Sequence, residues 1–210
     1  MMTLDDYIMD HIDEEDPLLA SLFRDAHVKL THPHMIAGRL QGRLLKMICR
    51  IKRPKRVLEI GTYTGYATLS IAEGLDEDAL VYSVEKNDEI QPFTIPYIEQ
   101  SPYRDKIRLF WGQIERLFPS FDETFELVYI DADKRDYCAY YDLIFPHLPQ
   151  RALILVDNTL WSGKVLDDHP APSDKQTLGI MAFNEKIKKD DRVEKVIIPV
   201  RDGLTMIWKK

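Results

Sequence analysis

Five short apolar runs that alternate with helix-like stretches constrain the fold of this chain more than any other feature. Each has four or five residues, the length of a buried strand. They are Arg56–Ile60, Leu80–Val84, Ile107–Trp111, Leu127–Ile130 and Ala152–Val156. Two further runs, Val193–Val200 and Leu204–Trp208, flank Arg201-Asp202-Gly203 and predict a C-terminal hairpin. We expect an α/β fold with a mostly parallel seven-stranded sheet, a final antiparallel hairpin and helices on both faces.

The segment before the first predicted strand has helical character. Residues 4–31 alternate acidic and apolar residues, which predicts one or two short helices with Pro17 at a helix start. Residues 38–51 carry apolar residues at helical spacing, so one face should be buried: Leu40, Leu44, Leu45, Ile48 and Ile51. We predict a helical N-terminal extension over 1–34 and the main domain over 35–210.

Composition excludes several classes of protein. The 210 residues carry a net charge of −7, which disfavours a protein that binds nucleic acid through its phosphates. Hydrophobic residues make up 45% of the chain, which argues against intrinsic disorder. No apolar run approaches the roughly 20 residues of a membrane helix, and the acidic N-terminus differs from a signal peptide. Cys49 and Cys138 form no disulfide framework, so we expect a cytoplasmic protein.

The end of the first predicted strand suggests a cofactor site. Gly61 and Gly65 follow it, and they would let the backbone approach a ligand at a helix start. Glu85 ends the next strand, 20 residues after Gly65, where an acidic side chain can bind ribose hydroxyls. The pattern favours an adenosine-type cofactor. The alternative is a tight turn beside surface carboxylates.

The ends of the fourth and fifth strands carry oxygen-bearing side chains. Asp131, Asp133 and Lys134 follow one strand, and Asp157 and Asn158 follow the other. Neighbouring strands lie ~4.8 Å apart, so these oxygens can converge on a hard cation such as Mg²⁺. Helix capping is the alternative for each residue taken alone. A lysine beside such a site can act as a base, whereas an ordinary lysine would be solvated.

Four motifs resemble one known family. They are VLEIGTYTGYATLSIA (57–72), YIDADKRDY (129–137), LVDNTLWSGKV (155–165) and PVRDGLTM (199–206). The chain resembles the cation-dependent, S-adenosylmethionine-dependent O-methyltransferases, the group that contains catechol and caffeoyl-CoA O-methyltransferases, and is most similar to their small bacterial members. The resemblance implies a single Rossmann-like methyltransferase domain, S-adenosylmethionine and Mg²⁺ (or Ca²⁺ or Mn²⁺) as cofactors, and a homodimer.

The resemblance also implies residue roles. The cofactor would be bound by Met35, Glu59, Gly61, Tyr63, Gly65, Ala67, Glu85, Gly112, Gln113, Ile114, Asp131 and Asp133. The metal ligands would be Asp131, Asp157 and Asn158. Lys134 would be the base, with Asp131 in the catalytic group, and the substrate would meet Lys134, Asn158 and Trp161.

The chain departs from the family pattern in two single residues and one run of three. Ala67 replaces a serine that binds the cofactor carboxylate in many members, so backbone N–H groups would have to serve. Gln113 replaces an aspartate near the adenine. Gly38-Arg39-Leu40 replaces a Ser-Pro-Glu run, which implies a differently shaped entrance.

The predicted function is O-methylation of a metal-chelated, catechol-like small molecule. A second hypothesis is methylation of a hydroxylated uridine in transfer RNA, which a basic stretch would favour: Arg39, Arg43, Lys46, Arg50, Lys52, Arg53, Lys55 and Arg56. A solvated helix face is the simpler interpretation of that stretch. A cofactor-binding scaffold without activity is the non-enzyme alternative, against which the intact set Asp131, Lys134, Asp157 and Asn158 argues.

Overall fold

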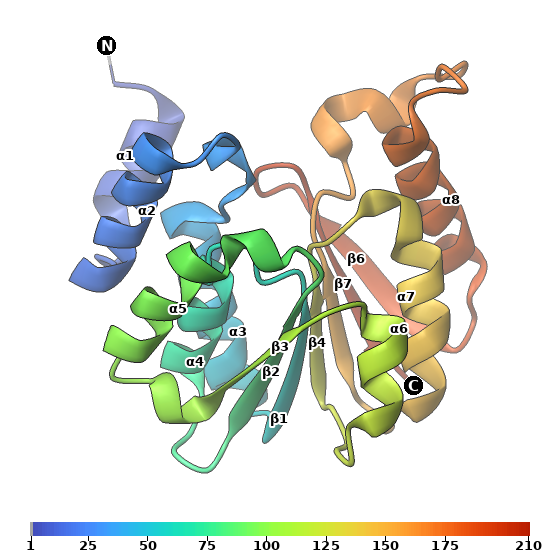
Figure 1. The fold of residues 1–210 in the computed structure, drawn as a ribbon. Coiled ribbons are helices and arrows are strands. Elements are labelled where there is room, and N and C mark those ends of the chain that lie inside the picture. The colour runs from blue at the N-terminus through green and yellow to red at the C-terminus, as the bar shows by residue number, and fades with distance from the viewer. Residues whose placement is uncertain (1) are drawn as a thin grey trace.

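The computed structural model describes residues 2–210, which form a seven-stranded sheet flanked by helices (Figure 1). The strands are β1 (Arg56–Ile60), β2 (Leu80–Glu85), β3 (Ile107–Trp111), β4 (Leu127–Ile130), β5 (Leu153–Val156), β6 (Val193–Ile198) and β7 (Leu204–Lys209). The helices are α1 (Leu4–His11), α2 (Pro17–Lys29), α3 (Gly38–Lys52), α4 (Tyr66–Gly74), α5 (Gln91–Gln100), α6 (Ile114–Leu117), α7 (Tyr137–Ile144) and α8 (Lys175–Lys189). The predicted strands and fold class are confirmed.

The strand order places a crevice in the middle of the sheet. The order is β3-β2-β1-β4-β5-β7-β6, and β1 to β5 pair in parallel. Only β7 runs against the others, because it pairs antiparallel with both β5 and β6. The chain steps outward from β1 to β3 and then returns to β4 on the other side of β1. Ligands of open α/β sheets bind at such a reversal, beyond the carboxyl ends of the strands.

The central strands β4 and β5 are buried on both faces of the sheet, which explains why they are apolar throughout, whereas the edge strand β6 is mostly exposed. Successive side chains alternate between two cores, so Val57 packs on one side and Leu58 on the other. The first core receives Leu19, Leu45, Leu69 and Ile98 from α2 to α5, and the second receives Ile114, Tyr141 and Phe183 from α6 to α8. These two groups of helices lie on opposite sides of the sheet in Figure 1.

The buried face of α3 differs from the predicted one. Ile51 is 77% exposed, whereas Gln41 and Cys49 are buried with Leu45 and Ile48. The reason is Gly42, where an added Cβ atom would lie 2.7 Å from Ser70 Oγ of α4. Close approach of α4 at this small residue turns the face that contains Gln41 inward, so the prediction for Ile51 is wrong.

Two helices precede α3. Pro17 starts α2, and the side chain of its N-cap, Asp16, accepts a hydrogen bond of 2.8 Å from Leu18 N. The predicted extension begins at Met1, which lies outside the described residues. Within residues 2–210, no helix combines the length and the apolar character that crossing a bilayer requires.

Candidate active site

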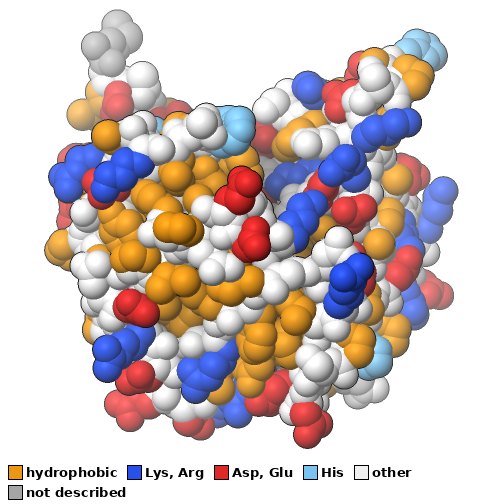
Figure 2. Space-filling model, in the orientation of Figure 1, with side chains coloured by type: hydrophobic (Ala, Val, Ile, Leu, Met, Phe, Trp, Pro, Cys, Tyr) orange, Lys and Arg blue, Asp and Glu red, His pale blue; other side chains and the backbone are white. Residues whose placement is uncertain are grey.

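A cavity of about 810 Å³ opens at the carboxyl ends of β1, β2, β4 and β5. Figure 2 shows the hollow between the side that carries the N-terminal helices and the side that carries α8. All but two of the predicted site residues line this cavity: Met35, Gly61, Tyr63, Ala67, Glu85, Gly112, Gln113, Ile114, Asp131, Asp133, Lys134, Asp157, Asn158 and Trp161. The fold therefore gathers residues that are spread over more than half of the chain.

The turn after β1 is pressed against the end of β4. Gly61 has a φ of +102°, and a Cβ atom there would lie 2.1 Å from the backbone oxygen of Asp131, so only glycine fits. The helix α4 follows, with Gly65 as its N-cap and Ala67 lining the cavity in its first turn. A negatively charged ligand group here would meet the backbone N–H groups of a helix start.

Glu85 is held rigidly beside this turn. Its Oε2 accepts a hydrogen bond of 2.8 Å from the backbone N of Tyr63, and its Oε1 accepts one of 2.8 Å from the backbone N of Asn87. An ionised carboxylate has further lone pairs on each oxygen, so the fixed group can still accept from two hydroxyls. We call the region lined by Gly61, Tyr63, Glu85 and 112–114 the cofactor end of the cavity.

Glu59 and Gly65 are the two predicted cofactor residues that do not line the cavity. The Glu59 side chain is fully buried, and its Oε2 accepts hydrogen bonds of 2.5 Å from the hydroxyls of Thr68 and Ser83. Gly65 faces α5, where an added Cβ atom would lie 3.1 Å from Ile98 Cδ1. Both residues pack against neighbouring elements next to the turn after β1 and do not contact the cavity.

Two carboxylates and a lysine meet at the other end. Lys134 Nζ donates to Asp131 Oδ1 at 2.8 Å, and the two side chains are only 13% and 18% exposed. Asp157 is buried, and its Oδ1 accepts from the backbone N of Asn158 at 2.8 Å. Burial and, second, the negative charge of Asp131 raise the pKa of Asp157. The two carboxylates are therefore close enough to repel each other.

Gln41 and Tyr129 are functional candidates that the sequence analysis missed. Gln41 Nε2 donates to Asp157 Oδ2 at 2.6 Å and to the Tyr129 hydroxyl at 2.7 Å. The Tyr129 hydroxyl donates to the same Asp157 oxygen at 3.2 Å. These contacts leave Asp157 a single orientation. One signal was available: Gln41 lies one helical turn before Leu45, on the apolar face of an amphipathic helix.

The donor set fits a hard divalent cation. Among residues 2–210, no three His, Cys, Asp or Glu side chains gather as a metal-ligand group. The protein would therefore offer the carboxylates of Asp131 and Asp157 and the amide oxygen of Asn158. Mg²⁺ is commonly held by one or two carboxylates and keeps several waters or substrate oxygens. A cation at this place would also relieve the repulsion that raises the pKa of Asp157.

Asp133 has a different environment. Its carboxylate accepts from Arg135 Nε at 2.8 Å and from Lys86 Nζ at 2.7 Å. The Arg135 guanidinium and, to a lesser degree, the Lys86 ammonium hold the pKa of Asp133 well below its usual range. Two cations already compensate its charge, so it is a weaker candidate for a metal or an amino group than Asp131.

Another group of lining residues forms what we call the acceptor end: His32, His34, Met35, Trp161, Gln176, Arg201 and Asp202, beside Asn158. Trp161 was predicted as a substrate residue and Met35 as a cofactor residue, whereas Arg201 and Asp202 were noted only as a hairpin turn within the motif 199–206 and were given no role at the site. Their place in the cavity depends on contacts with segments about 40 and 165 residues away. No local pattern contains that information.

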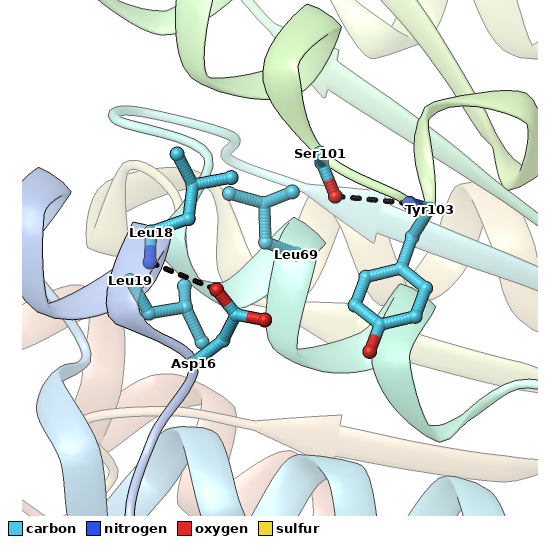
Figure 3. A pocket seen from close by; sticks show the side chains of 6 residues that line it. All are labelled: Asp16, Leu18, Leu19, Leu69, Ser101 and Tyr103. Carbon is cyan, nitrogen blue, oxygen red and sulfur yellow. Dashed lines mark hydrogen bonds between the residues drawn. The ribbon is translucent and has the colours of Figure 1, made fainter.

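A second, much smaller hollow lies between α2 and α4 (Figure 3). Its volume is about 10 Å³, and its lining includes Leu18, Leu19 and Leu69. Such a volume holds about one water molecule at most. It is a packing gap and not a ligand site.

Comparison with known proteins identifies relatives along most of the chain. The family model described as O-methyltransferase matches residues 9–210. A caffeoyl-CoA O-methyltransferase of Populus kitakamiensis is 33% identical over 175 residues, covering 79% of this chain and 74% of that protein. Caffeoyl-CoA O-methyltransferase 1 of Zea mays is 30% identical over 214 residues, covering 95% and 82%. The crystal structure of the O-methyltransferase from Bacillus cereus in complex with SAH matches with a TM-score of 0.89, 25% identity, and coverage of 99% and 97%.

Proposed function

This chain belongs to the O-methyltransferase family, and from that premise we propose that it methylates a hydroxyl group of a small aromatic molecule with S-adenosylmethionine as donor. One observation carries the proposal: a single cavity joins the carboxylate of Glu85 to the cluster of Asp131, Lys134, Asp157 and Asn158. The first suits a ribose, and the second suits a metal-chelated acceptor.

Several residues would bind the donor. Glu85 accepts from the ribose hydroxyls, and the helix start at Ala67 takes the carboxylate group through backbone N–H groups. When bound, S-adenosylmethionine supplies a methyl group that leaves its sulfonium sulfur, which keeps the electron pair, as the acceptor oxygen forms the new O–C bond. The SAH complex of the Bacillus cereus relative supports this choice of cofactor.

The acceptor hydroxyl would lose its proton to Lys134 Nζ. The ion pair of 2.8 Å with Asp131 orients that nitrogen, and Lys134 would act as the base after its ammonium form has released a proton to water in the cavity. A divalent cation held by Asp131, Asp157 and Asn158 would supply a Lewis acid that lowers the pKa of the hydroxyl. Because the methyl donor is already activated, orientation of the acceptor is the main task of the protein.

The basic stretch does not favour transfer RNA as the acceptor. Most of its charges are paired: Arg39 with Glu14, Arg43 and Lys46 with Glu73, Arg53 with Asp76, Lys55 with Asp78, and Arg56 with Glu123. Phosphate binding depends on cations that are free to replace counterions. The names of the caffeoyl-CoA O-methyltransferases also support a small aromatic acceptor.

The test is methyl transfer from labelled S-adenosylmethionine to caffeic acid and to bulk transfer RNA, each with Mg²⁺ and with chelator. We expect chelator-sensitive transfer to caffeic acid. Transfer to RNA alone would contradict the small-molecule acceptor. Transfer that chelator does not reduce would contradict the metal site. Binding of S-adenosylhomocysteine without any transfer would favour the scaffold hypothesis.

A further inference from the structure

The turn between β6 and β7 joins two walls of the acceptor end. One wall is the segment 32–37, which includes Met35, and the other is the loop 158–163, which includes Trp161. More than 120 residues of chain separate them. The turn Val200–Gly203 contributes Arg201 and Asp202 to the same cavity and contacts both walls.

Asp202 holds the Trp161 wall. Its backbone oxygen accepts from Leu160 N at 2.8 Å and from Trp161 N at 3.3 Å. Its carboxylate Oδ1 accepts from the backbone N of Ser162 at 2.6 Å and from the Ser162 hydroxyl at 3.0 Å. One residue therefore fixes three successive residues of the loop.

The loop needs this support because its backbone is unusual. Asn158, Trp161 and Ser162 have φ values of +58°, +47° and +51°, in the left-handed region that side chains other than glycine rarely adopt. Such conformations persist only where the surroundings impose them. Loss of the Asp202 carboxylate would let Ser162, and with it the adjacent Trp161, return to more common conformations.

Arg201 holds the opposite wall. Its guanidinium Nη1 donates at 2.8 Å to the backbone oxygen of Ile36, the residue after Met35. Ile36 is 3% exposed, so the accepting residue is itself firmly packed. Adjacent residues of one turn thus fix the two walls relative to each other.

We propose that Arg201 and Asp202 are positioning residues that determine which hydroxyl of the acceptor is methylated. They act through the walls: Arg201 fixes the Met35 side, Asp202 fixes the Trp161 side, and the distance between the two sides sets the orientation of the acceptor ring. This inference rests on the proposed function. It predicts that loosening either contact changes acceptor KM and product ratio, whereas Gly61 and Glu85 of the cofactor end, which are held by Asp131, Tyr63 and Asn87, are unaffected.

Arg201→Gly is the sharper test because it preserves the turn. Arg201 has a φ of +49°, which glycine adopts without strain, so the variant should keep the conformation of the turn. Arg151→Gly is a matched control, since Arg151 also has a left-handed φ, of +65°, and lies outside the cavity lining. With caffeic acid we expect only Arg201→Gly to raise KM, by about five- to tenfold for one lost hydrogen bond, and to bring the ratio of 3-O- to 4-O-methyl product towards one.

Asp202→Ala tests the other wall, with Asp202→Asn as the conservative variant. Asn keeps an oxygen that can accept from Ser162 N, so it should restore most of the wild-type product ratio. Asp190→Ala is the control. The carboxylate Oδ1 of Asp190 also accepts a hydrogen bond from a backbone N, that of Arg192 at 3.0 Å, just before the hairpin. Asp190 does not line the cavity. We expect Asp190→Ala to lower the melting temperature without changing the product ratio.

The outcomes separate this inference from the proposed function. The inference is supported if the wild type is active and both cavity variants show a changed KM and product ratio. Their affinity for S-adenosylhomocysteine should equal that of the wild type. Active wild type with unchanged KM and product ratio in Arg201→Gly and Asp202→Ala would overturn it and leave the proposed function intact. A wild type that methylates no hydroxyl acceptor would overturn the proposed function and this inference with it.

Discussion

The cofactor end of the cavity is built from strand ends and backbone contacts, whereas the acceptor end consists of loops that side chains hold together. At the cofactor end, Gly61 touches the backbone of Asp131, and backbone N–H groups hold Glu85. At the acceptor end, Arg201 and Asp202 connect segments that no strand pairing joins. The cofactor end is part of the sheet, whereas the acceptor end can change without disturbing the sheet.

The two ends should therefore respond differently to mutation. Changes at the cofactor end should lower stability and cofactor affinity together, because the same contacts serve both. Changes at the acceptor end should alter chemistry and selectivity while the fold and the cofactor affinity persist. The following variants test that division.

Asp157→Ala should have the largest effect on turnover. It removes one of two carboxylates proposed to hold the cation, whose charge stabilisation is worth several kcal/mol, so we expect roughly a thousandfold loss of Mg²⁺-dependent transfer. The fold should persist, because Gln41 Nε2 keeps its hydrogen bond to the Tyr129 hydroxyl. Calorimetry should show S-adenosylhomocysteine affinity close to that of the wild type.

The control for that variant is Asp122→Ala, which removes an exposed aspartate outside the cavity lining. Its turnover should equal that of the wild type. Full Mg²⁺-dependent turnover in Asp157→Ala would contradict the metal assignment. Loss of cofactor binding in Asp157→Ala would break the division between the two ends.

Gly61→Ala should have the largest effect on stability. Its Cβ atom would overlap the backbone oxygen of Asp131, and its φ is left-handed, so we expect a loss of about 3 kcal/mol in the free energy of unfolding. Gly163 in the acceptor loop also has a left-handed φ, but a Cβ atom there meets nothing within 4 Å. Gly163→Ala should therefore cost only about 1 kcal/mol. Urea unfolding measures both, and equal losses would argue against the rigidity of the cofactor end.

Glu85→Ala should weaken cofactor binding with a smaller effect on the fold. Hydrogen bonds to a charged group contribute about 1.5–3 kcal/mol, so S-adenosylhomocysteine affinity should fall by roughly ten- to a hundredfold. Glu89→Ala, four residues on and exposed, is the matched control and should bind normally. An unchanged affinity in Glu85→Ala would remove the ribose role from Glu85.

The same division explains what the sequence could predict. Strand ends, glycine turns and acidic residues after strands are local patterns, and parallel pairing brings them to one edge of the sheet by rule. Glu85, Asp131 and Asp157 accordingly line one cavity. The roles proposed for these residues stay predictions.

The parts that the sequence could not predict depend on packing between distant segments. Gln41 reaches Asp157 because Gly42 lets α3 approach α4 closely, and helical spacing alone instead indicated Ile51 as buried. Arg201 reaches Ile36 across 165 positions of sequence. The sequence also could not predict the environment of Glu59. Its position near the end of a strand does not reveal that its side chain is fully buried and does not line the cavity.

Glu59→Gln should have the smallest effect on activity and a pH-dependent effect on stability. Burial raises the pKa of Glu59 to about 8, from an ordinary value of 4.5. Between these values the native state holds a proton that the unfolded state has released, so the free energy of unfolding falls as pH rises. Glutamine does not titrate. The variant should come within about 1 kcal/mol of the wild type near pH 5 and exceed its stability by on the order of 4 kcal/mol at pH 8.

Urea unfolding at both pH values tests this prediction, and parallel pH profiles would show that native Glu59 is ionised. S-adenosylhomocysteine affinity near pH 7 should change by less than about twofold, because a neutral glutamine replaces an already neutral acid of the same shape. A large loss of affinity would mean that the charge of Glu59 reaches the cofactor. Cofactor binding would then depend on the charge of this buried residue, which does not line the cavity, as well as on the backbone contacts of Gly61 and Glu85.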